Sequence, residues 1–171
     1  FVQFHPTGMV WPPSVRGILV TEGVRGEGGR LTNSDGDRFM FNYVPEMFQG
    51  DHAETIEEAD QWVEEVVSGK LATVRRPPEL LTRDVVAKAI KAEVEAGRGS
   101  PHGGAFLDIS HRGEEAIKKK LPSMYHQFME LAGVDITKDA MEVGPTAHYI
   151  MGGIRVDAES QETTVPGPVS Y

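Results

Sequence analysis

Arg83 combines a permanent charge with a position suited to binding anions. It follows Thr82 and opens a predicted helix over residues 83–96. At a helix start the backbone N–H groups are unpaired and the helix dipole is positive. A guanidinium beside such groups forms a strong anion site, because charged and backbone donors converge on one ligand. Exposed arginines at helix starts are also common, so the residue alone leaves both interpretations open.

Two of the six histidines stand between residues that restrict the backbone. His5 lies in the run Phe4-His5-Pro6-Thr7-Gly8, and His148 lies in Gly144-Pro145-Thr146-Ala147-His148-Tyr149. Because Pro and Gly fix the chain beside them, both histidines are candidates for ligand binding, although a lone histidine is more often structural. The others lack rigid flanks and are interpreted as structural: His52, His102, His111 and His126.

Several common catalytic and metal-binding motifs are absent from the sequence. No histidine pair has i, i+4 spacing and no H-E-x-x-H motif occurs, so no metal site is predicted. Cysteine is absent, which removes thiol catalysis and disulfides, and no serine occupies a G-x-S-x-G motif. The run Arg25-Gly26-Glu27-Gly28-Gly29 matches neither a P-loop nor G-x-G-x-x-G, so it predicts a flexible turn.

The charge of the chain limits the classes of partner that it is expected to bind. The 171 residues carry 17 Lys+Arg against 26 Asp+Glu, a formal net charge of −9. Nucleic-acid binding needs a basic surface, so this acidity argues against a nucleic-acid partner and against adhesion to an anionic membrane. No run of about 18 consecutive apolar residues occurs, so no membrane-spanning helix is predicted. The composition favours one acidic domain compatible with the cytosol.

The hydrophobic periodicity predicts the elements that must position these side chains. Helices are expected at residues 55–67, 83–96, 114–121 and 123–132, a strand at 105–109, and strand-and-turn character at 141–156. The first 45 residues predict short strands and turns, including a hairpin turn at Asn33-Ser34-Asp35-Gly36 and a strand that starts at Arg38. Helices and strands are segregated rather than alternating, which is typical of an α+β fold.

Two of the predicted helices have clear start signals. Thr55 and Glu58 have the spacing of a capping box, and Thr82 is the predicted N-cap of the next helix, which Gly97 ends. Residues 51–67 hold seven acidic residues and no lysine or arginine; these are Asp51, Glu54, Glu57, Glu58, Asp60, Glu64 and Glu65. We interpret this acidic helix as a solvated face, with a docking surface as the alternative.

A series of runs strongly resembles the flavoprotein subunit of the succinate dehydrogenase/fumarate reductase family. In chain order they are Phe4-His5-Pro6-Thr7-Gly8, Leu19-Val20-Thr21-Glu22-Gly23-Val24-Arg25-Gly26-Glu27-Gly28-Gly29, Gly36-Asp37-Arg38-Phe39-Met40, Arg83-Asp84-Val85-Val86-Ala87, Leu107-Asp108-Ile109, Gly133-Val134-Asp135-Ile136-Thr137 and Val143-Gly144-Pro145-Thr146-Ala147-His148-Tyr149-Ile150-Met151-Gly152-Gly153-Ile154. Each run alone is weak evidence, but the combination is specific and covers nearly the whole chain.

The resemblance implies an α+β capping domain, the lid of such enzymes, with short flanking pieces of the FAD-binding domain. Residues 1–150 would form the capping domain with the edges of the substrate site. Residues 151–171 would begin the return into the FAD-binding domain, where the sequence stops. The chain is therefore expected to be a fragment of a longer flavoprotein and to be inactive alone.

The same resemblance implies roles for individual residues. His5, Thr21, Glu22 and His148 would hold a dicarboxylate substrate, and Arg83 would transfer a proton. The cofactor-binding positions that the resemblance offers are Gly152 and Gly153. A further substrate arginine and the dinucleotide-binding glycines of the family have no counterpart in this sequence.

The implied reaction is the interconversion of succinate and fumarate, with a hydride exchanged at flavin N5. FAD would belong to the full-length enzyme, and none is expected on this chain alone. The implied partners are the dicarboxylate, an FAD domain, and an iron-sulfur subunit with membrane-anchor subunits. The implied location is the cytoplasm, or the cytoplasmic face of the inner membrane through those subunits.

The chemistry of the substrate agrees with these roles. Succinate and fumarate are dianions, so a site needs two separated groups of donors, one for each carboxylate. A free arginine keeps its proton throughout the working pH range. Proton transfer by Arg83 therefore requires neighbouring charges, with Glu22 or another carboxylate passing the proton onward.

Two alternatives remain open from the sequence. L-aspartate oxidase shares the fold and several of these motifs, although the run from Pro145 to Gly153 is more similar to the dicarboxylate branch. The other alternative is a non-catalytic protein, an isolated lid or binding module without a cofactor.

Overall fold

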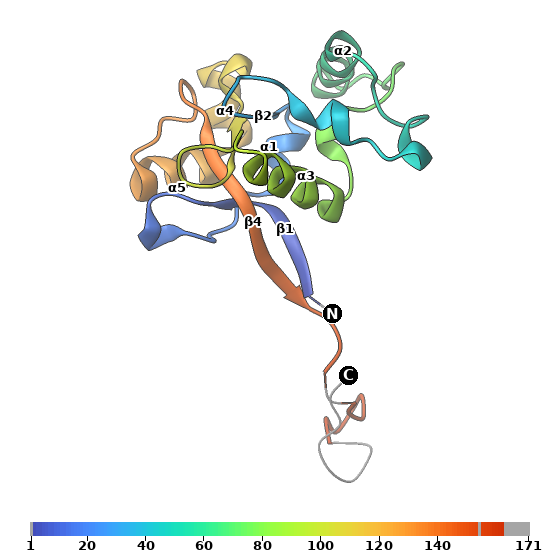
Figure 1. The fold of residues 1–171 in the computed structure, drawn as a ribbon, viewed down its shortest axis with the longest axis vertical. Coiled ribbons are helices and arrows are strands. Elements are labelled where there is room, and N and C mark those ends of the chain that lie inside the picture. Colours follow the sequence, from blue (N-terminus) through green and yellow to red (C-terminus); the bar gives the residue numbers. More distant parts are fainter. Residues whose placement is uncertain (1, 154, 163–171) are drawn as a thin grey trace.

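The computed structural model describes residues 2–153 and 155–162 of the chain. Its elements are a small sheet, α-helices and short 3-10 helices (Figure 1). The mixture of helices with an antiparallel sheet confirms the predicted α+β class. Residue 154 and residues 163–171, which belong to the predicted return into an FAD-binding domain, lie outside the described residues.

The sheet has the strand order β1-β4-β3-β2, and each neighbouring pair is antiparallel. β1 (Val2–Met9) pairs with β4 (Met141–Ile150), so the first strand of the chain lies beside the last. This long pair extends beyond the rest of the molecule (Figure 1). β3 (Ala105–Asp108) confirms the strand predicted at 105–109, and β2 (Arg30–Thr32) completes the sheet.

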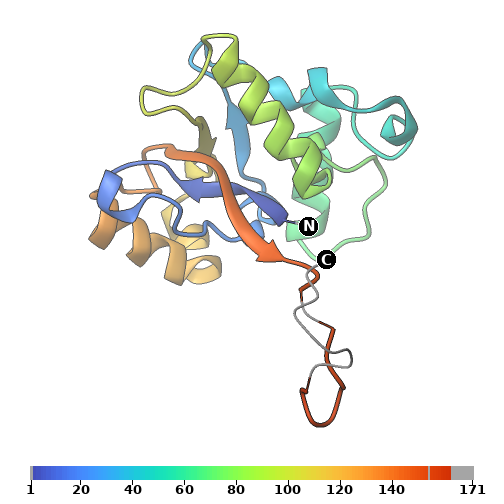
Figure 2. The same ribbon diagram turned by 60° about the horizontal axis from the view of Figure 1, so that its bottom comes forward.

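α3 (Arg83–Glu95) packs against β1 and β4 and forms the centre of the core. Val86, Ala89 and Ile90 are buried along one face at helical spacing, as their sequence pattern predicts. Gly97, with φ +79°, follows the helix end in a conformation that favours glycine. Figure 2 shows α3 above the β1–β4 pair and the α5 region below it.

The remaining long helices also lie where the sequence predicts them. They are α2 (Ile56–Val67), α4 (Glu114–Lys120) and α5 (Pro122–Ala132). Gly133 ends α5 in the left-handed conformation. The short 3-10 helices are η1 (Pro13–Val15), η2 (Phe39–Tyr43), η3 (Glu46–Phe48), η4 (Pro78–Leu80) and η5 (Ser110–Arg112).

Two predictions for the first 45 residues are wrong. The strand expected from Arg38 is the 3-10 helix η2, because the consecutive residues Phe39 and Met40 are both buried. A strand would have pointed them to opposite faces. The glycine-rich run expected to be a flexible turn begins inside a short helix, α1 (Glu22–Gly26), and then packs tightly. A Cβ on Gly29 would lie 2.7 Å from the carbonyl oxygen of Val24.

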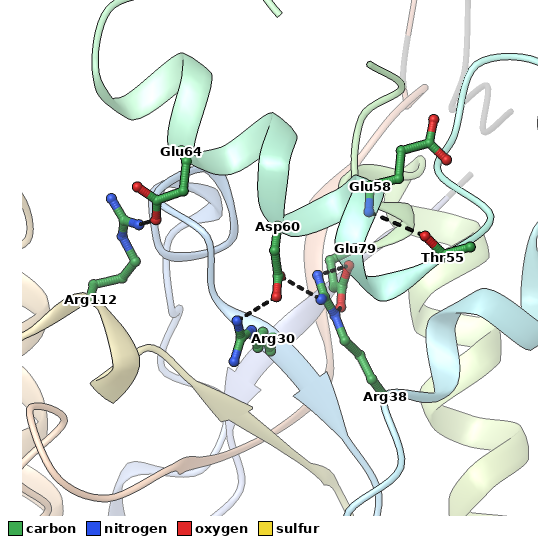
Figure 3. Close-up of polar contacts among 8 residues, drawn as sticks. All are labelled: Arg30, Arg38, Thr55, Glu58, Asp60, Glu64, Glu79 and Arg112. Atoms are coloured by element: carbon green, nitrogen blue, oxygen red, sulfur yellow. Dashed lines mark hydrogen bonds and ion pairs between the residues drawn. The ribbon is translucent and has the colours of Figure 1, made fainter. Parts of the chain in front are cut away.

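The acidic face of α2 is solvated in part, as predicted, since the side chain of Glu64 is 72% exposed, but several of its carboxylates also pair with arginines (Figure 3). Asp60 Oδ2 accepts from Arg30 at 2.7 Å and its Oδ1 accepts from Arg38 at 2.8 Å. Other pairs join Arg75 to Glu54 and Glu58, and Arg112 to Glu64. The charge pattern did not reveal these pairs because their arginines lie outside residues 51–67 in the sequence.

Half of the predicted capping box at α2 is present. The hydroxyl of Thr55 accepts from the backbone N–H of Glu58 at 3.2 Å (Figure 3), while the Glu58 carboxylate accepts from the N–H of Glu54. In a complete capping box, the Glu58 carboxylate would accept a hydrogen bond from the backbone N–H of Thr55 itself.

Gly104 permits the close approach of β3 to β4. A Cβ at this position would lie 2.2 Å from the carbonyl oxygen of Val143, a backbone atom that cannot move without disturbing the sheet.

We expect Gly104→Ala to lower the free energy of unfolding by about 1–3 kcal/mol through overpacking. Urea unfolding measures the change. Gly50→Ala is the control, because a Cβ at Gly50 meets no atom within 4 Å; equal effects of the two variants would contradict the explanation.

Candidate functional site

The pairing of β1 with β4 brings His5 and His148 together. Their ring centroids are 5.3 Å apart, with an edge-to-face angle of 67°. The register places Gln3 opposite Tyr149 and Phe4 opposite Ala147, so His148 is the extra residue of a β-bulge. A bulge redirects side chains along the strand on which it occurs. This local irregularity therefore turns His148 toward His5. The family resemblance assigned both residues to binding of the dicarboxylate.

His5 is a buried, neutral donor. The residue is only 1% exposed, and its Nδ1 accepts from the backbone N–H of Thr7 at 3.3 Å. Since Nδ1 accepts, the ring hydrogen of the neutral form lies on Nε2. Burial, followed by the positive charges of Arg25 and Arg83, lowers the pKa of His5 to about 4. The ring is therefore neutral at physiological pH and presents an N–H without a charge.

Arg83 opens α3, as predicted, and its guanidinium joins two other elements. Nη2 lies 3.2 Å from Oε2 of Glu22, and Nε lies 3.3 Å from the same oxygen. Nη1 donates to Oε1 of Gln3 on β1 at 3.2 Å. The Arg83 side chain is 34% exposed and that of Glu22 is 54% exposed. The structure thus pairs the predicted proton donor directly with the carboxylate predicted beside it.

Arg25 is a site residue that the sequence analysis missed. Its side chain is 1% exposed, and Nη2 lies 3.9 Å from Oε2 of Glu22. Burial lowers the pKa of Arg25 below its usual value, and the charge of Glu22 partly opposes this effect. The one signal in the sequence was its spacing from Glu22, because residues at i and i+3 share a helix face. The carboxylate of Glu22 therefore lies between two guanidinium groups.

A cleft of about 1050 Å³ opens beside this group of charges. Its lining includes Gln3, Glu22, Leu81 and Arg83. Arg83 lines the cleft and opens α3, so a guanidinium and the start of a helix can together bind an anion there. Glu22 lies at hydrogen-bond distance from Arg83, whereas Arg25 lies 3.9 Å from Glu22 and makes no hydrogen bond to it. The arrangement therefore places an anion-binding group beside a carboxylate.

The remaining predicted site residues are less closely tied to this group. Thr21 precedes Glu22 as the N-cap residue of α1, and its side chain is exposed. Gly152 and Gly153 lie beyond the end of β4 in the exposed C-terminal segment, with φ of +94° and +130°.

The described residues hold no group of three or more His, Asp or Glu side chains placed to bind a metal. In the same part of the chain, no helix has the length and apolar character that crossing a membrane requires.

Several known proteins are similar to this chain in sequence and in fold. The family model described as "FAD binding domain" matches residues 1–167. A fumarate reductase (CoM/CoB) subunit of Methanothermobacter marburgensis is 48% identical over 156 residues, which cover 91% of this chain and 23% of that protein. The succinate dehydrogenase flavoprotein subunit of Coxiella burnetii is 36% identical over 167 residues, covering 96% of this chain and 23% of that protein.

A solved structure agrees with these relatives. The structure of Mycobacterium smegmatis Sdh1 in complex with UQ1 has 59% sequence identity and a TM-score of 0.65, and the match covers 92% of this chain and 21% of that chain. The present chain thus spans less than a quarter of the length of each of these relatives. The chain belongs to the FAD binding domain family, and relatives that it matches are named as subunits of fumarate reductase and succinate dehydrogenase.

Proposed function

We propose that this chain is the capping domain of an FAD-dependent oxidoreductase that interconverts succinate and fumarate. The observation that carries the proposal is the convergence of His5, His148 and Arg83 at one edge of the sheet, with Glu22 behind Arg83. These residues come from both ends of the chain and from α3, and they match the roles that the family resemblance implies.

Substrate binding follows from the charges. A dicarboxylate brings two negative charges, and Arg83 supplies a charged donor for it at the mouth of the cleft. His5 and His148 lie next to one another on the β1–β4 pair and outside the lining of this cleft. We assign them to the substrate from the family resemblance, and the neutral ring of His5 keeps Nε2 as a donor without adding a charge that must be desolvated. Thr21 is close in the chain to Glu22 and adds a hydroxyl at the same end of the site.

Proton transfer runs through side chains of this chain. Arg83 gives a proton to the substrate carbon when fumarate is reduced and takes one when succinate is oxidised. Glu22 lies within 3.3 Å of two nitrogens of that guanidinium and restores or removes the proton. Arg25 faces Glu22 from the protein interior at 3.9 Å and adds a positive charge beside it without a hydrogen bond. The proton thus passes between the substrate, Arg83 and Glu22, and Glu22, whose side chain is 54% exposed, exchanges it with water.

Gly152 and Gly153 are the positions that the family resemblance offers for FAD. Both have positive φ, and a Cβ at Gly153 would meet no atom within 4 Å. When bound, FAD supplies the group that accepts or donates the hydride. The motifs that cradle its pyrophosphate belong to other parts of the longer relatives, since the sequence contains no G-x-G-x-x-G.

The same proposal covers domain organisation and partners. Residues 1–150 form the lid and residues 151–171 lead back into the FAD-binding domain. In support, the projecting end of the β1–β4 pair exposes apolar residues that a second domain can cover; Val2, Phe4, Tyr149 and Ile150 are 46% to 80% exposed. An iron-sulfur subunit and membrane-anchor subunits would hold the whole enzyme at the cytoplasmic face of the inner membrane, and a form without them would be cytoplasmic.

The first test replaces the proton donor in the complete flavoprotein. Arg83→Lys keeps the positive charge but loses the planar fork that contacts Glu22 and Gln3 together. We expect turnover of fumarate and of succinate to fall by at least about 100-fold. The Kd for a dicarboxylate should stay within about threefold, since the charge remains. Steady-state kinetics and calorimetry measure the two quantities.

The matched control is Arg16→Lys, the same substitution at an exposed arginine of another loop. It should leave both turnover and binding unchanged. Near-normal rates in Arg83→Lys would refute the assigned role. Oxidation of aspartate in place of succinate by the unmodified enzyme would refute the proposed substrate class.

The second test uses the charge state of His5. The pKa of His5 is lowered from 6.5 in the unfolded chain to about 4 in the folded one. As the pH falls below about 6.5, the unfolded chain binds a proton that the folded chain does not, so stability is lost at up to about 1.4 kcal/mol per pH unit until about pH 4. Urea unfolding of the protein at pH 7 and pH 5 should therefore show a smaller loss in His5→Gln than in the unmodified chain. His126→Gln, at an exposed histidine, should leave the loss unchanged; identical pH dependence in all three proteins would contradict a neutral, buried His5.

The third test concerns the 171-residue protein by itself. We expect it to remain colourless after incubation with FAD and gel filtration, because its sequence lacks a pyrophosphate-binding motif. It should also catalyse no fumarate reduction. Stoichiometric flavin absorbance in the eluted protein would contradict the assignment of this chain to the lid.

A further inference from the structure

The guanidinium of Arg25 is held in place from one side. Nη1 donates to the backbone carbonyl of Glu79 at 2.6 Å. Among the described residues, Nε and Nη2 have no hydrogen-bond partner, although both are buried. Arg25 therefore depends on the carbonyl of Glu79 to keep its orientation toward Glu22.

Glu79 is itself fixed by a buried ion pair. Its Oε1 accepts from Nε of Arg38 at 2.5 Å, and its Oε2 accepts from Nη2 at 3.2 Å. The two side chains are 1% and 6% exposed. The third nitrogen of Arg38 donates to Asp60 on α2 at 2.8 Å (Figure 3). A two-pronged pair of this kind fixes geometry as well as charge.

The position of Glu79 in the chain gives this pair two effects. Glu79 is the middle residue of η4, and the N–H of Leu81 closes that turn onto the carbonyl of Pro78 at 3.1 Å. Arg83 follows four residues after Glu79 at the start of α3. Holding the Glu79 side chain therefore fixes both the carbonyl that binds Arg25 and the segment that delivers Arg83.

We propose that the Arg38–Glu79 ion pair, anchored to α2 by Asp60, is the positioning element that aligns Arg25, Glu22 and Arg83 for proton transfer. The inference rests on the proposed function, since it concerns the proton route of that reaction. Arg38, Glu79 and Asp60 act through Arg25 and through the start of α3. Their effect is on alignment and on the charge of Arg25.

The charged and titratable groups that face Arg25 define its pH dependence. Glu22 of α1 and Glu79 of η4 favour its charged form, while burial and Arg83 of α3 disfavour it. His5 of β1 is close enough for Arg25 to lower its pKa. Removing the charge of Glu79 takes away one of the two groups that favour the charged form. Arg25 then loses its proton at lower pH.

The experiment compares two buried carboxylates in the complete flavoprotein. Glu79→Gln should lower kcat by about 10- to 100-fold through misalignment. KM for succinate should change by less than about threefold, and the alkaline limb of the kcat profile should move to lower pH. Glu93→Gln is the matched control, because the Glu93 side chain is 3% exposed and Arg98 holds it through two hydrogen bonds. It should lower Tm by a similar amount and leave kcat and its pH profile unchanged.

A milder variant keeps the test decisive if Glu79→Gln does not fold. Asp60 is 35% exposed, and Asp60→Asn weakens its pairs with Arg38 and Arg30 while leaving the Arg38–Glu79 pair in place; it should lower kcat by about three- to tenfold without changing KM. A wild-type kcat and pH profile in both variants, or an equal loss of kcat in Glu93→Gln, would overturn the inference. These outcomes leave the proposed function standing, whereas an unmodified enzyme that turns over neither succinate nor fumarate overturns that function itself.

Discussion

The antiparallel pairing of β1 with β4 is the interaction on which the candidate site depends. It joins residues 2–9 to residues 141–150, so the contact between His5 and His148 depends on a pairing between segments far apart in the sequence. The bulge at His148 is as important as the pairing, because a regular strand would alternate its side chains between faces. α3 packs on the same two strands and brings Arg83 to them. Residues from β1, from β4 and from α3 in the middle of the sequence therefore lie at one edge of the sheet.

The distribution of charge over the molecule depends on where its acidic residues lie and on which arginines they pair with. The formal charge is −9, yet two arginines and a neutral histidine dominate the site. Much of the acidic helix is neutralised where it meets the domain, since Asp60 lies between Arg30 and Arg38. Opposite charges at hydrogen-bond distance offset the desolvation of such contacts in a half-buried setting. In the cleft beside Arg83, by contrast, the carboxylates of Glu22 and Asp84 stand among several cationic side chains.

The sequence predicted well what depends on nearby residues. The boundaries of α2 and α3 lie where Thr55, Thr82, Gly97 and the apolar spacing predict them, although Thr82, unlike Thr55, makes no side-chain cap hydrogen bond. All of these signals lie within a few residues of the helix. What it missed are contacts between distant residues. Arg25 binds Glu79, 54 residues away, and Arg83 binds Glu22, 61 residues away. Charge counts cannot distinguish a buried, paired arginine from an exposed one, so Arg25 and the ion pairs of α2 became visible only in the fold.

A carboxylate in a site for dianions needs a physical reason, because Glu22 repels the substrate that Arg83 attracts. Two guanidiniums facing one another without a counter-charge would repel each other and disfavour burial of Arg25. Glu22 lies between them, 3.2 Å from one and 3.9 Å from the other, and offsets that repulsion. Its carboxylate also lies at hydrogen-bond distance from two nitrogens of Arg83, whereas the other oxygen there, Oε1 of Gln3, belongs to an amide that is not a base. In the proposed reaction, the same carboxylate that weakens anion binding is the group that can return a proton to Arg83 after the guanidinium has given one up.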